Sequence, residues 1–304
     1  MAESGARSDG SVRLISRRDG EREVLAVVVG SDLVIDALDV ASDLPGTMAA
    51  LIDGGPAALG SLRIGVRAVG PDRASALGRP LASVTLAPPV GRVGKVIAVG
   101  KNYREHAAEE GVEAPGEPLL FAKFPSSIVG DGADITWRAS DSSQVDWEAE
   151  LAVVIGRRCR DVAVADALDA VLGYTCLNDV SARDLQFGDG QWVRGKSLDT
   201  FCPIGPWLVT ADDIPHPQAL GIRCLVEGEI VQDASTAQMI HGVATLIAYA
   251  SRFMTLQPGD VIATGTPGGV GVFRDPPRFL ADGQEVIVEI DGIGRLRNVC
   301  RVVA

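Results

Sequence analysis

The order of apolar and polar positions predicts a chain built mainly from short strands. Near the start, three apolar runs at residues 12–18, 23–30 and 32–38 are separated by short polar turns, which is typical of strands. Residues 47–55 have helical spacing and end in two glycines, which predicts a short helix. Two prolines then interrupt the apolar pattern, and we place a domain boundary at residues 89–93.

Beyond this boundary, strands and a few helices follow one another without the regular rhythm of a parallel α/β sheet. A helix is expected to begin near Asn102, whose side chain suits an N-cap. The longest helix is expected over residues 235–256, because its apolar positions fall on one face. We also expect strands at 95–100, 119–124, 145–156, 174–179, 285–292 and 295–303, and helices at 164–173, ended by Gly173, and at 181–186.

This pattern predicts an α+β fold that is mostly β. We expect residues 1–10 to form a disordered leader, residues 11–90 to form a small β-rich N-terminal domain, and residues 93–304 to form a larger second domain. The length allows a sizeable core in the second domain.

Composition and charge exclude several classes of protein. The 304 residues carry a formal net charge of −12, whereas nucleic acids and anionic membranes demand clustered Lys and Arg. The five cysteines are scattered without a C-x-x-C pair, which fits reduced thiols rather than a disulfide framework or a zinc site. The sequence contains neither the pattern of a secretory signal nor that of a membrane span. We therefore expect a soluble, cytoplasmic protein with a small-molecule partner.

The strand predicted over residues 145–156 begins with acids at every second position. Alternate side chains share a face, so Glu148 and Glu150 are expected to point the same way where the strand enters the core. Like charges there are costly unless a cation neutralises them, and Mg2+ takes such oxygen ligands. Asp179, at the end of the next apolar strand, would complete a triad, whereas Asp146 is not assigned as a ligand. On spacing alone, a solvated strand end and a helix cap at Asp179 remain the alternatives.

Three further groups carry candidate chemistry. His106 and Glu109 are three positions apart on a predicted helical turn, where the carboxylate would orient the imidazole as a general base; an exposed helical pair is the alternative. Lys196 is a candidate charge for a substrate carboxylate, or an ordinary solvated lysine. The glycine-rich segment 264–271 lacks the lysine of a P-loop, and is either an anion-binding turn that includes Thr266 or a purely structural turn.

The order of these motifs along the chain resembles the fumarylacetoacetate hydrolase superfamily. The segments that carry the resemblance are GKNYREHAAE, FAK, DWEAELAVVIG, GYTCLNDVSARDLQ, QWVRGKSLDTFCPIGPWLVT, LQPGDVIATGTPGGVG and DGIGRLRN. They cover roughly residues 93–300, and the N-terminal part also looks like the small domain of many bacterial members. The chain departs from the family in lacking a proline within ITWRASDSSQ and in having Glu227 where members often have Asn.

This resemblance implies a mixed β-sandwich roll for residues 93–304, which would be the catalytic domain of a homodimer that binds Mg2+ or Mn2+. By match to the family motifs, the metal ligands would be Glu148, Glu150 and Asp179. The catalytic group would be the dyad His106–Glu109, on a short lid helix, with Lys196. The residues that match the family's substrate contacts are Lys123, Arg183, Gln186 and Thr266.

The resemblance also implies a reaction of 2-oxo acids. In our hypothesis the metal acts as a Lewis acid that stabilises an enolate, while His106 activates water to cleave a C–C bond in an acylpyruvate or fumarylpyruvate. The same enolate would serve isomerisation of hydroxymuconate- or hydroxyheptadienedioate-type diacids and decarboxylation of oxaloacetate. The intact dyad favours hydrolysis, because a decarboxylase needs no activated water. Isomerisation is the closest alternative, and a catalytically idle dimer that only binds a 2-oxo acid is an alternative from another class.

Overall fold

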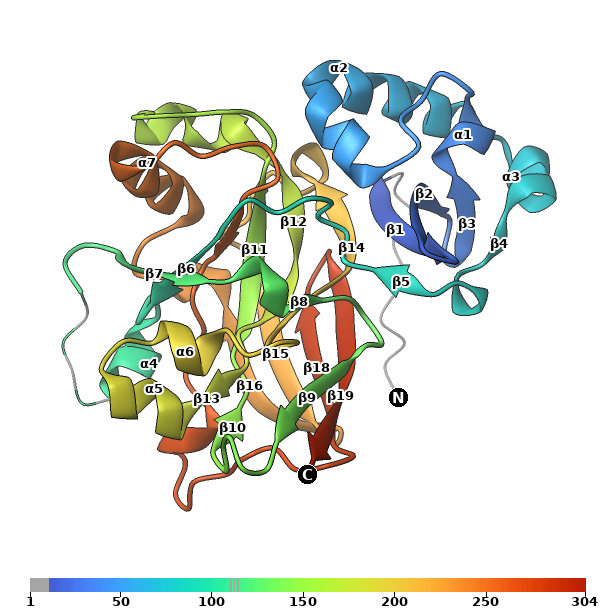
Figure 1. Cartoon of the computed structure of the whole chain (residues 1–304). Coiled ribbons are helices and arrows are strands. Elements are labelled where there is room, and N and C mark those ends of the chain that lie inside the picture. Colours follow the sequence, from blue (N-terminus) through green and yellow to red (C-terminus); the bar gives the residue numbers. More distant parts are fainter. Residues whose placement is uncertain (1–10, 110, 112, 114) are drawn as a thin grey trace.

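The computed structural model describes residues 11–304 except residues 110, 112 and 114. The leader predicted for residues 1–10 lies outside the described residues. Strands dominate, so the fold is α+β and mostly β, as predicted. Figure 1 shows the N-terminal segment, in blue, beside a larger body of strands.

A large mixed sheet runs through the molecule. Its strands are β1 (Arg13–Asp19), β2 (Arg22–Val29), β3 (Leu33–Asp36), β4 (Arg79–Pro80), β5 (Leu86–Ala87), β6 (Val96–Gly100), β7 (Leu119–Lys123), β8 (Ile128–Val129), β11 (Ala149–Ile155), β12 (Val171–Asn178), β14 (Cys202–Thr210) and β17 (Val261–Ala263). Among the described residues the order is β4-β3-β2-β1-β14-β12-β11-β17-β6-β7, with β5 attached to β1 and β8 to β14. The pairs β6–β17 and β8–β14 are parallel, and the other pairs are antiparallel.

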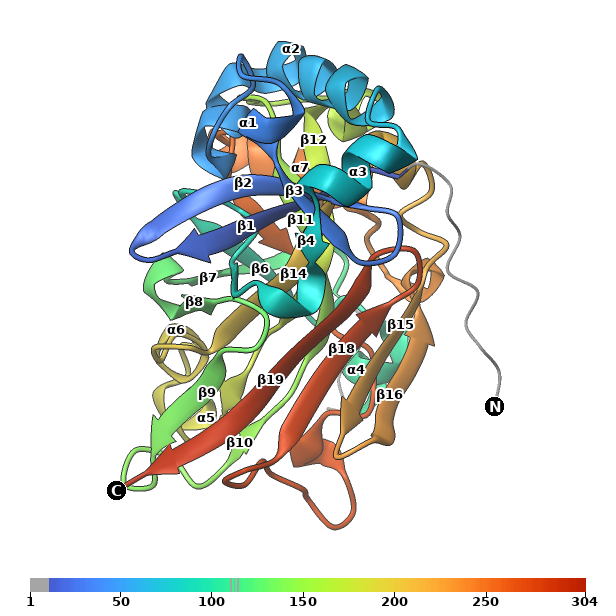
Figure 2. The ribbon, with the colours of Figure 1, turned by 90° about the vertical axis from the view of Figure 1, so that its right-hand side faces the viewer.

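A second sheet packs against the first, and side chains from both form one hydrophobic core. Its strands are β9 (Asp134–Arg138), β15 (Gly221–Val226), β16 (Glu229–Ser235), β18 (Glu285–Ile290) and β19 (Gly294–Val303). Their order is β16-β15-β18-β19-β9, and this sheet faces the viewer in Figure 2. A small ribbon pairs β10 (Val145–Asp146) with β13 (Ser181–Ala182). The antiparallel pair β18–β19 is the hairpin predicted for the end of the chain.

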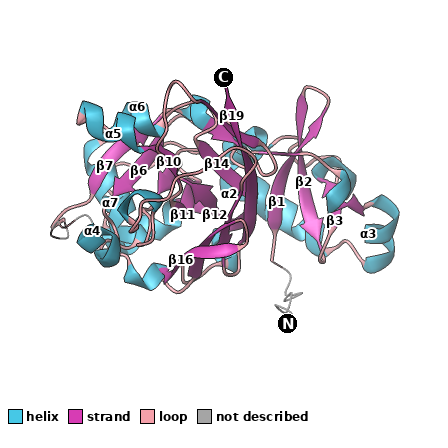
Figure 3. Cartoon of the chain, turned by 90° about the horizontal axis from the view of Figure 1, so that it is seen from below, coloured by secondary structure: helices cyan, strands magenta, loops and turns pink. Residues whose placement is uncertain are grey.

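The helices gather around the strands, as Figure 3 shows in cyan. They are α1 (Ala37–Val40), α2 (Met48–Arg67), α3 (Pro71–Leu77), α4 (Arg104–Glu109), α5 (Arg183–Asp189), α6 (Val193–Lys196) and α7 (Val243–Phe253). In the part of the chain that the structure describes, no helix has the length and apolar character that crossing a membrane requires.

The N-terminal segment joins the large sheet, because β1 pairs with β14 with Leu14 opposite Leu208. These two leucines also share a hydrophobic core with residues of α2. Arg63 of α2 forms an ion pair with Asp213, with Nη2 3.2 Å from Oδ2. The boundary predicted at residues 89–93 therefore lies between two parts of the chain that share both a sheet and a core.

Strand β11 separates two hydrophobic cores, and all of its residues are buried. Leu151 and Val153 belong to the core between the two sheets. Ala152 and Val154 belong to the core beneath the N-terminal segment. A strand covered on both faces carries apolar side chains on both, which explains the continuous run LAVVI. Glu150, at 1% exposure, therefore enters the interior and is not a solvated strand end.

One of two predicted helix ends is confirmed and the other is wrong. The helix expected over residues 47–55 is interrupted by a kink at Gly55, where φ is 59° and ψ is −151°, and a second helical segment, which the sequence pattern did not predict, completes α2 to Arg67. Pro56 follows the kink. Proline fits the first turn of the new helical segment because the backbone N–H that it lacks would have no partner within the helix there. Gly173 does not end a helix but lies inside β12, where an added Cβ would come within 2.2 Å of the carbonyl oxygen of Val209. The segment before it is a 3₁₀ helix over 164–170.

The predicted long helix over 235–256 and the predicted helix cap at Asn102 were also wrong. The long helix expected over 235–256 is a 3₁₀ turn at 236–238 followed by the shorter helix α7, which begins after Gly242. Asn102 does not cap α4. Its amide donates to the carbonyl oxygens of His241 and Thr264, and its oxygen accepts the N–H of His241. Asn102 thus connects the segment before α4 to the loops that contain His241 and Thr264.

Candidate active site

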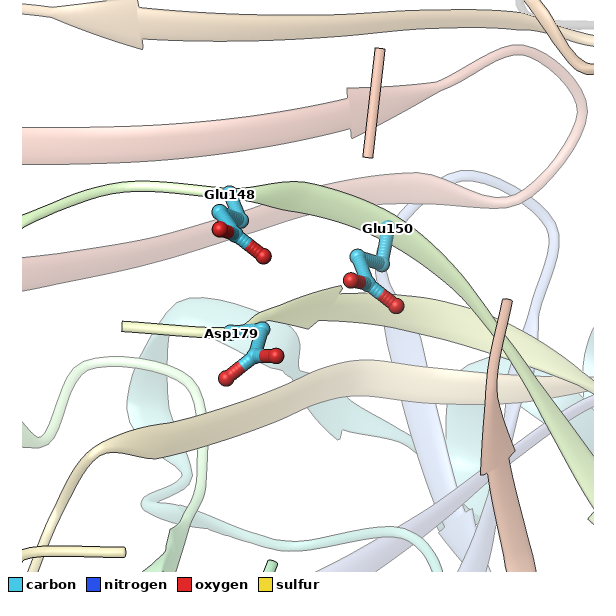
Figure 4. Close-up of side chains that lie close together, drawn as sticks. All are labelled: Glu148, Glu150 and Asp179. Atoms are coloured by element: carbon cyan, nitrogen blue, oxygen red, sulfur yellow. The ribbon is translucent and has the colours of Figure 1, made fainter. Parts of the chain in front are cut away.

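Three carboxylates from two neighbouring strands form the centre of the site. Glu148 precedes β11, Glu150 lies within it, and Asp179 follows β12, which pairs with β11. One oxygen of each lies within 4.8 Å of the other two, and all three side chains are buried. Figure 4 shows the three carboxyl groups gathered at this end of the strands. The structure therefore brings together the residues predicted to be metal ligands.

The carboxylates of the triad affect one another's ionisation. Burial, together with the charges of Asp179 and Glu148, raises the pKa of Glu150 well above its usual value of 4.5. Burial alone would also raise the pKa of Glu148, but Lys196 and then Arg183 lower it to about 2. The neighbouring cations thus stabilise the ionised form of Glu148, whereas they do not offset the burial and the like charges that act on Glu150.

Two buried lysines face the triad. Lys123, at the end of β7, places Nζ 2.6 Å from Oδ1 of Asp179 and also donates to the carbonyl oxygen of Lys196. Lys196, at the end of α6, places Nζ 2.7 Å from Oε2 of Glu148 and 3.1 Å from Oδ2 of Asp179. Burial acts to lower the pKa of Lys196, but Asp179 and Glu148 outweigh it and raise the pKa. Lys196 is therefore an ammonium in this site.

Arg183, the first residue of α5, links the triad to a fourth buried carboxylate, that of Asp146. Its Nη2 lies 2.7 Å from Oε1 of Glu148, and its Nε donates to Oδ1 of Asp146 at 2.7 Å. Its Nη1 donates to Oε1 of Gln186, also on α5, at 2.9 Å. The ribbon β10–β13 sets this arrangement, because Asp146 pairs with Ser181 just before α5 begins. Asp146 thus lies behind Arg183 and outside the triad.

His106 and Glu109 form the predicted pair on the short helix α4. Nδ1 of His106 lies 3.5 Å from Oε2 of Glu109, and the His106 residue is 4% exposed. The other oxygen of Glu109 accepts the N–H of Gly269 at 2.7 Å, so this carboxylate is held from two sides. A carboxylate at Nδ1 favours the tautomer that accepts a proton at Nε2, as a general base does.

The glycine-rich loop after β17 connects the carboxylates of the site. Three of its backbone N–H groups donate to three different carboxylates: Gly265 to Glu150 at 2.8 Å, Gly269 to Glu109 at 2.7 Å, and Val272 to Asp146 at 2.9 Å. Gly265 and Gly269 have φ values of 94° and 98°, which only glycine adopts without strain. The loop therefore offers backbone N–H groups to anions, as one of the two alternatives expected, and these anions are carboxylates of the protein itself.

Gln232 is a residue of the site that sequence reasoning missed. It lies on β16 of the second sheet, is 2% exposed, and donates from Nε2 to Oγ1 of Thr266 at 2.8 Å and to the carbonyl oxygen of Pro267 at 2.9 Å. Its Oε1 accepts the N–H of Ala149 at 2.9 Å. Gln232 reaches the site through packing between the two sheets, so the sequence around it did not mark it as a site residue.

A narrow cavity opens over the triad. Its lining consists of Val99, Gly100, Lys101, His106, Phe121, Glu148, Arg183, Gln186, Trp192, Lys196 and Thr266. Glu150, Asp179 and Lys123 lie beneath it, none more than 1% exposed. All the predicted site residues therefore surround one centre. Lys123, expected to contact substrate, instead lies against Asp179 and does not line the cavity.

The triad fits a hard divalent cation. Its donors are all carboxylate oxygens, the ligands that Mg2+ and Mn2+ prefer. The buried carboxylates around the centre are Asp146, Glu148, Glu150 and Asp179, and the buried cations are Lys123, Arg183 and Lys196. Burial, and then repulsion from Asp179 and Glu148, raises the pKa of Glu150. A divalent cation would relieve that repulsion and would leave the site with a net positive charge for an anionic ligand.

Comparison with known sequences gives a consistent family. The family model described as fumarylacetoacetate (FAA) hydrolase C-terminal matches residues 95–303. The chain is 50% identical over 218 residues to the oxaloacetate tautomerase fahd2, mitochondrial, of Xenopus laevis, covering 71% of this chain and 68% of that protein. It is 46% identical over 270 residues to the oxaloacetate tautomerase FAHD2A, mitochondrial, of Bos taurus, covering 87% of this chain and 83% of that protein.

Solved structures of similar proteins align with almost the whole chain. The fumarylacetoacetate hydrolase of Exiguobacterium antarcticum has a TM-score of 0.79 and 38% identity, over 96% of this chain and 100% of that chain. The 2-hydroxyhepta-2,4-diene-1,7-dioate isomerase of Mycobacterium marinum has a TM-score of 0.74 and 36% identity, over 96% and 99%. The maleylpyruvate hydrolase of Sphingobium sp. SYK-6, in complex with manganese(II) and pyruvate, has a TM-score of 0.78 and 34% identity, over 96% and 100%.

Proposed function

Because the chain belongs to the fumarylacetoacetate hydrolase family, we propose that it is a divalent-metal-dependent enzyme that interconverts the keto and enol forms of oxaloacetate or a closely similar 2-oxo diacid. Two curated relatives with 50% and 46% identity are named oxaloacetate tautomerases. The isomerase and the maleylpyruvate hydrolase among the solved structures are 36% and 34% identical. Two further relatives, 54% identical over 67% of this chain, are named putative hydrolases, so identity alone does not separate the two reactions. The match to the tautomerase of Bos taurus covers 87% of this chain, and this longer match supports tautomerisation over the hydrolysis that the motifs alone favour.

One arrangement carries the proposal: a buried carboxylate triad and a carboxylate-held imidazole meet at a single narrow cavity. Glu148, Glu150 and Asp179 would hold Mg2+ or Mn2+. When bound, such an ion supplies Lewis acidity, which polarises a 2-oxo group and makes the protons on the adjacent carbon more acidic.

The side chains of this protein would divide the remaining work. Lys196 and Arg183, both cationic and both at the cavity, would attract and orient the carboxylates of the diacid. His106, held by Glu109, would take the proton from the carbon next to the keto group and return it to the oxygen, or carry it in reverse. The narrow cavity would limit access of bulk water, which competes for protons and weakens these charges.

The test follows the enol absorbance of oxaloacetate with purified protein and Mg2+ or Mn2+, with and without chelator. The proposal expects rapid keto–enol equilibration that chelator abolishes, without net consumption of oxaloacetate beyond the metal-only rate. A Glu148→Gln variant controls for catalysis by free metal. Equilibration at the rate of the protein-free control would refute the proposal.

Hydrolysis of an acylpyruvate is the second candidate, and a specific observation favours it. The His106–Glu109 pair is intact, and such a pair can activate water as well as shuttle a proton. Release of pyruvate from maleylpyruvate, fumarylpyruvate or acetylpyruvate under the same conditions would distinguish it. Turnover of any of these faster than equilibration of oxaloacetate would make the hydrolase the main activity.

A further inference from the structure

The orientation of the Gln232 side chain amide is fixed by its neighbours. The backbone N–H of Ala149 only donates, so the oxygen of the amide must face it, at 2.9 Å. The carbonyl of Pro267 only accepts, so the amide nitrogen must face the loop, at 2.9 Å. A flipped amide would set donor against donor and acceptor against acceptor at a residue that is 2% exposed.

This orientation determines what the hydroxyl of Thr266 does. One hydrogen of the Gln232 amide goes to Pro267 and the other goes to Oγ1 of Thr266, at 2.8 Å. The Thr266 oxygen is therefore a hydrogen-bond acceptor on that side, and its own hydrogen remains to be donated. Thr266 is 2% exposed and lines the cavity above the triad, so the hydrogen has the cavity available to it.

We propose that Gln232 is a positioning residue that makes Thr266 a hydrogen-bond donor to the carboxylate of the substrate. The inference rests on the proposed function, in which a 2-oxo acid occupies this cavity. A hydroxyl that is free to rotate offers a lone pair to an anion as readily as a hydrogen. Here the second sheet, through Gln232, occupies one of the two lone pairs of the Thr266 oxygen and turns the hydroxyl hydrogen away from Gln232, so the site favours an acceptor such as a carboxylate.

A pair of nearly isosteric substitutions tests this role. Gln232→Glu replaces the donor with an acceptor of the same shape, so that the Thr266 hydroxyl donates to the new carboxylate and not to the ligand. Thr266→Val removes the hydroxyl. Gln232→Met removes the donor without adding a charge, and it carries the same test if the Glu variant does not fold. The probe is pyruvate, titrated calorimetrically into protein saturated with Mg2+, alongside kcat and KM for oxaloacetate.

A matched control lies outside the site. Gln218 has the same bonding pattern, because its Oε1 accepts the N–H of Val243 at 2.7 Å and its Nε2 donates to the carbonyl oxygen of Thr236 at 2.8 Å. Gln218→Glu should lower the melting temperature while leaving the affinity for pyruvate unchanged. A loss of affinity in this control equal to that of Gln232→Glu would mean that both act through the fold, and it would overturn the proposal.

The expected result is a loss of pyruvate affinity of about ten- to a hundredfold in Gln232→Glu and in Thr266→Val, the range for a hydrogen bond to a charged group. KM should rise more than kcat falls, and the double variant should bind no more weakly than the weaker single variant. Wild-type affinity in Gln232→Glu, or losses that multiply in the double variant, would overturn the positioning role. If wild-type protein binds pyruvate but does not turn over oxaloacetate, the proposed function fails. The pyruvate affinities of the single and double variants then still test the role of Gln232. If it binds no pyruvate, the inference fails, while turnover of oxaloacetate still decides the proposed function.

Discussion

Asp146 is fully buried, and its two carboxylate oxygens serve different elements of the site. One accepts from Arg183 at 2.7 Å and the other accepts the N–H of Val272 at 2.9 Å. Burial raises the pKa of Asp146, and the charge of Arg183 opposes this rise. Asp146 therefore connects an arginine that lines the cavity to the loop after β17, without itself lining the cavity.

Replacing Asp146 tests this connection. In Asp146→Asn the amide accepts from only one partner, so either Arg183 or the N–H of Val272 loses its acceptor in a buried position. We expect a loss of about 2 kcal/mol in the free energy of unfolding and a higher KM for oxaloacetate, measured by urea denaturation and steady-state kinetics. Asp166→Asn, at an exposed position, is the control and should change neither quantity. An unchanged KM in Asp146→Asn would show that Arg183 needs no such support.

Glu150 gives a prediction that depends on pH. Its pKa is raised in the folded protein relative to 4.5, so ionising it costs more in the folded chain than in the unfolded one. Below about pH 4.5 Glu150 is neutral in both the folded and the unfolded chain, and its ionisation costs no stability. As the pH rises through the raised pKa, this carboxyl group lowers the free energy of unfolding. In metal-free protein, Glu150→Gln should therefore stabilise the fold at pH 7 and should give no gain at pH 4, as measured by urea denaturation with chelator.

Addition of Mg2+ supplies the control for Glu150. The divalent cation should stabilise the wild-type protein at pH 7, because it binds the folded state and relieves the repulsion among the carboxylates. The Glu150→Gln variant should gain much less from the same addition. A variant that is less stable than wild type in chelator at pH 7 would contradict this account of the triad.

At the scale of elements, the loop after β17 holds three carboxylates of the site through its backbone N–H groups. Gly269 donates its N–H to Glu109 with φ at 98°, and an added Cβ would come within 2.3 Å of the carbonyl oxygen of Val231. Gly269→Ala should therefore lower kcat strongly and destabilise the fold. Gly283 has a similar φ of 81° but has no atom within 4 Å of an added Cβ, so Gly283→Ala should cost only the backbone strain of ~1–3 kcal/mol. Equal effects on kcat in the two variants would refute the role of the loop.

The same scale shows what the sequence could predict. The strands β1, β2, β7 and β18 follow from local alternation or apolar runs and have the expected places. Spacing alone left the triad and the dyad beside structural alternatives, and it was the family resemblance that assigned their residues. The break at Gly55 follows from the sequence, but the second helical segment of α2 and the start of α7 after Gly242 were not predicted. Gln232 could not be predicted, because its partners come from two distant segments.

At the scale of the whole molecule, the N-terminal segment and the catalytic part form one continuous sheet. Local patterns predict strands on both sides of residue 90, but they do not predict that β1 would pair with β14, more than 180 residues away. Long-range pairing of this kind depends on which edges the complete fold leaves open. Residues 89–93 therefore lie between two parts of one continuous sheet.

The homodimer implied by the family resemblance stays a prediction. Phe124 and Phe187 are 56% and 51% exposed, and Phe124 follows β7 while Phe187 lies on α5, two elements that carry site residues. Single exposed apolar side chains are common on protein surfaces, so these two positions serve to test the predicted interface and are not evidence for it. We expect light scattering after size exclusion to give twice the mass of the chain, and a double substitution of both residues by Ser to lower it. A monomeric mass for the wild-type protein would contradict the prediction.

The most direct test of the central claim is a metal back-titration. The protein is stripped of metal with chelator, dialysed, and titrated with Mn2+ while the rate of oxaloacetate keto–enol equilibration is recorded for wild type and Glu148→Gln. The account predicts a negligible rate above background without metal and a rise that saturates at one ion per chain, because the described residues contain one such carboxylate group. Glu148→Gln should stay near background throughout. A metal-free protein that keeps its full rate, or a Glu148→Gln variant that recovers it, would contradict the account.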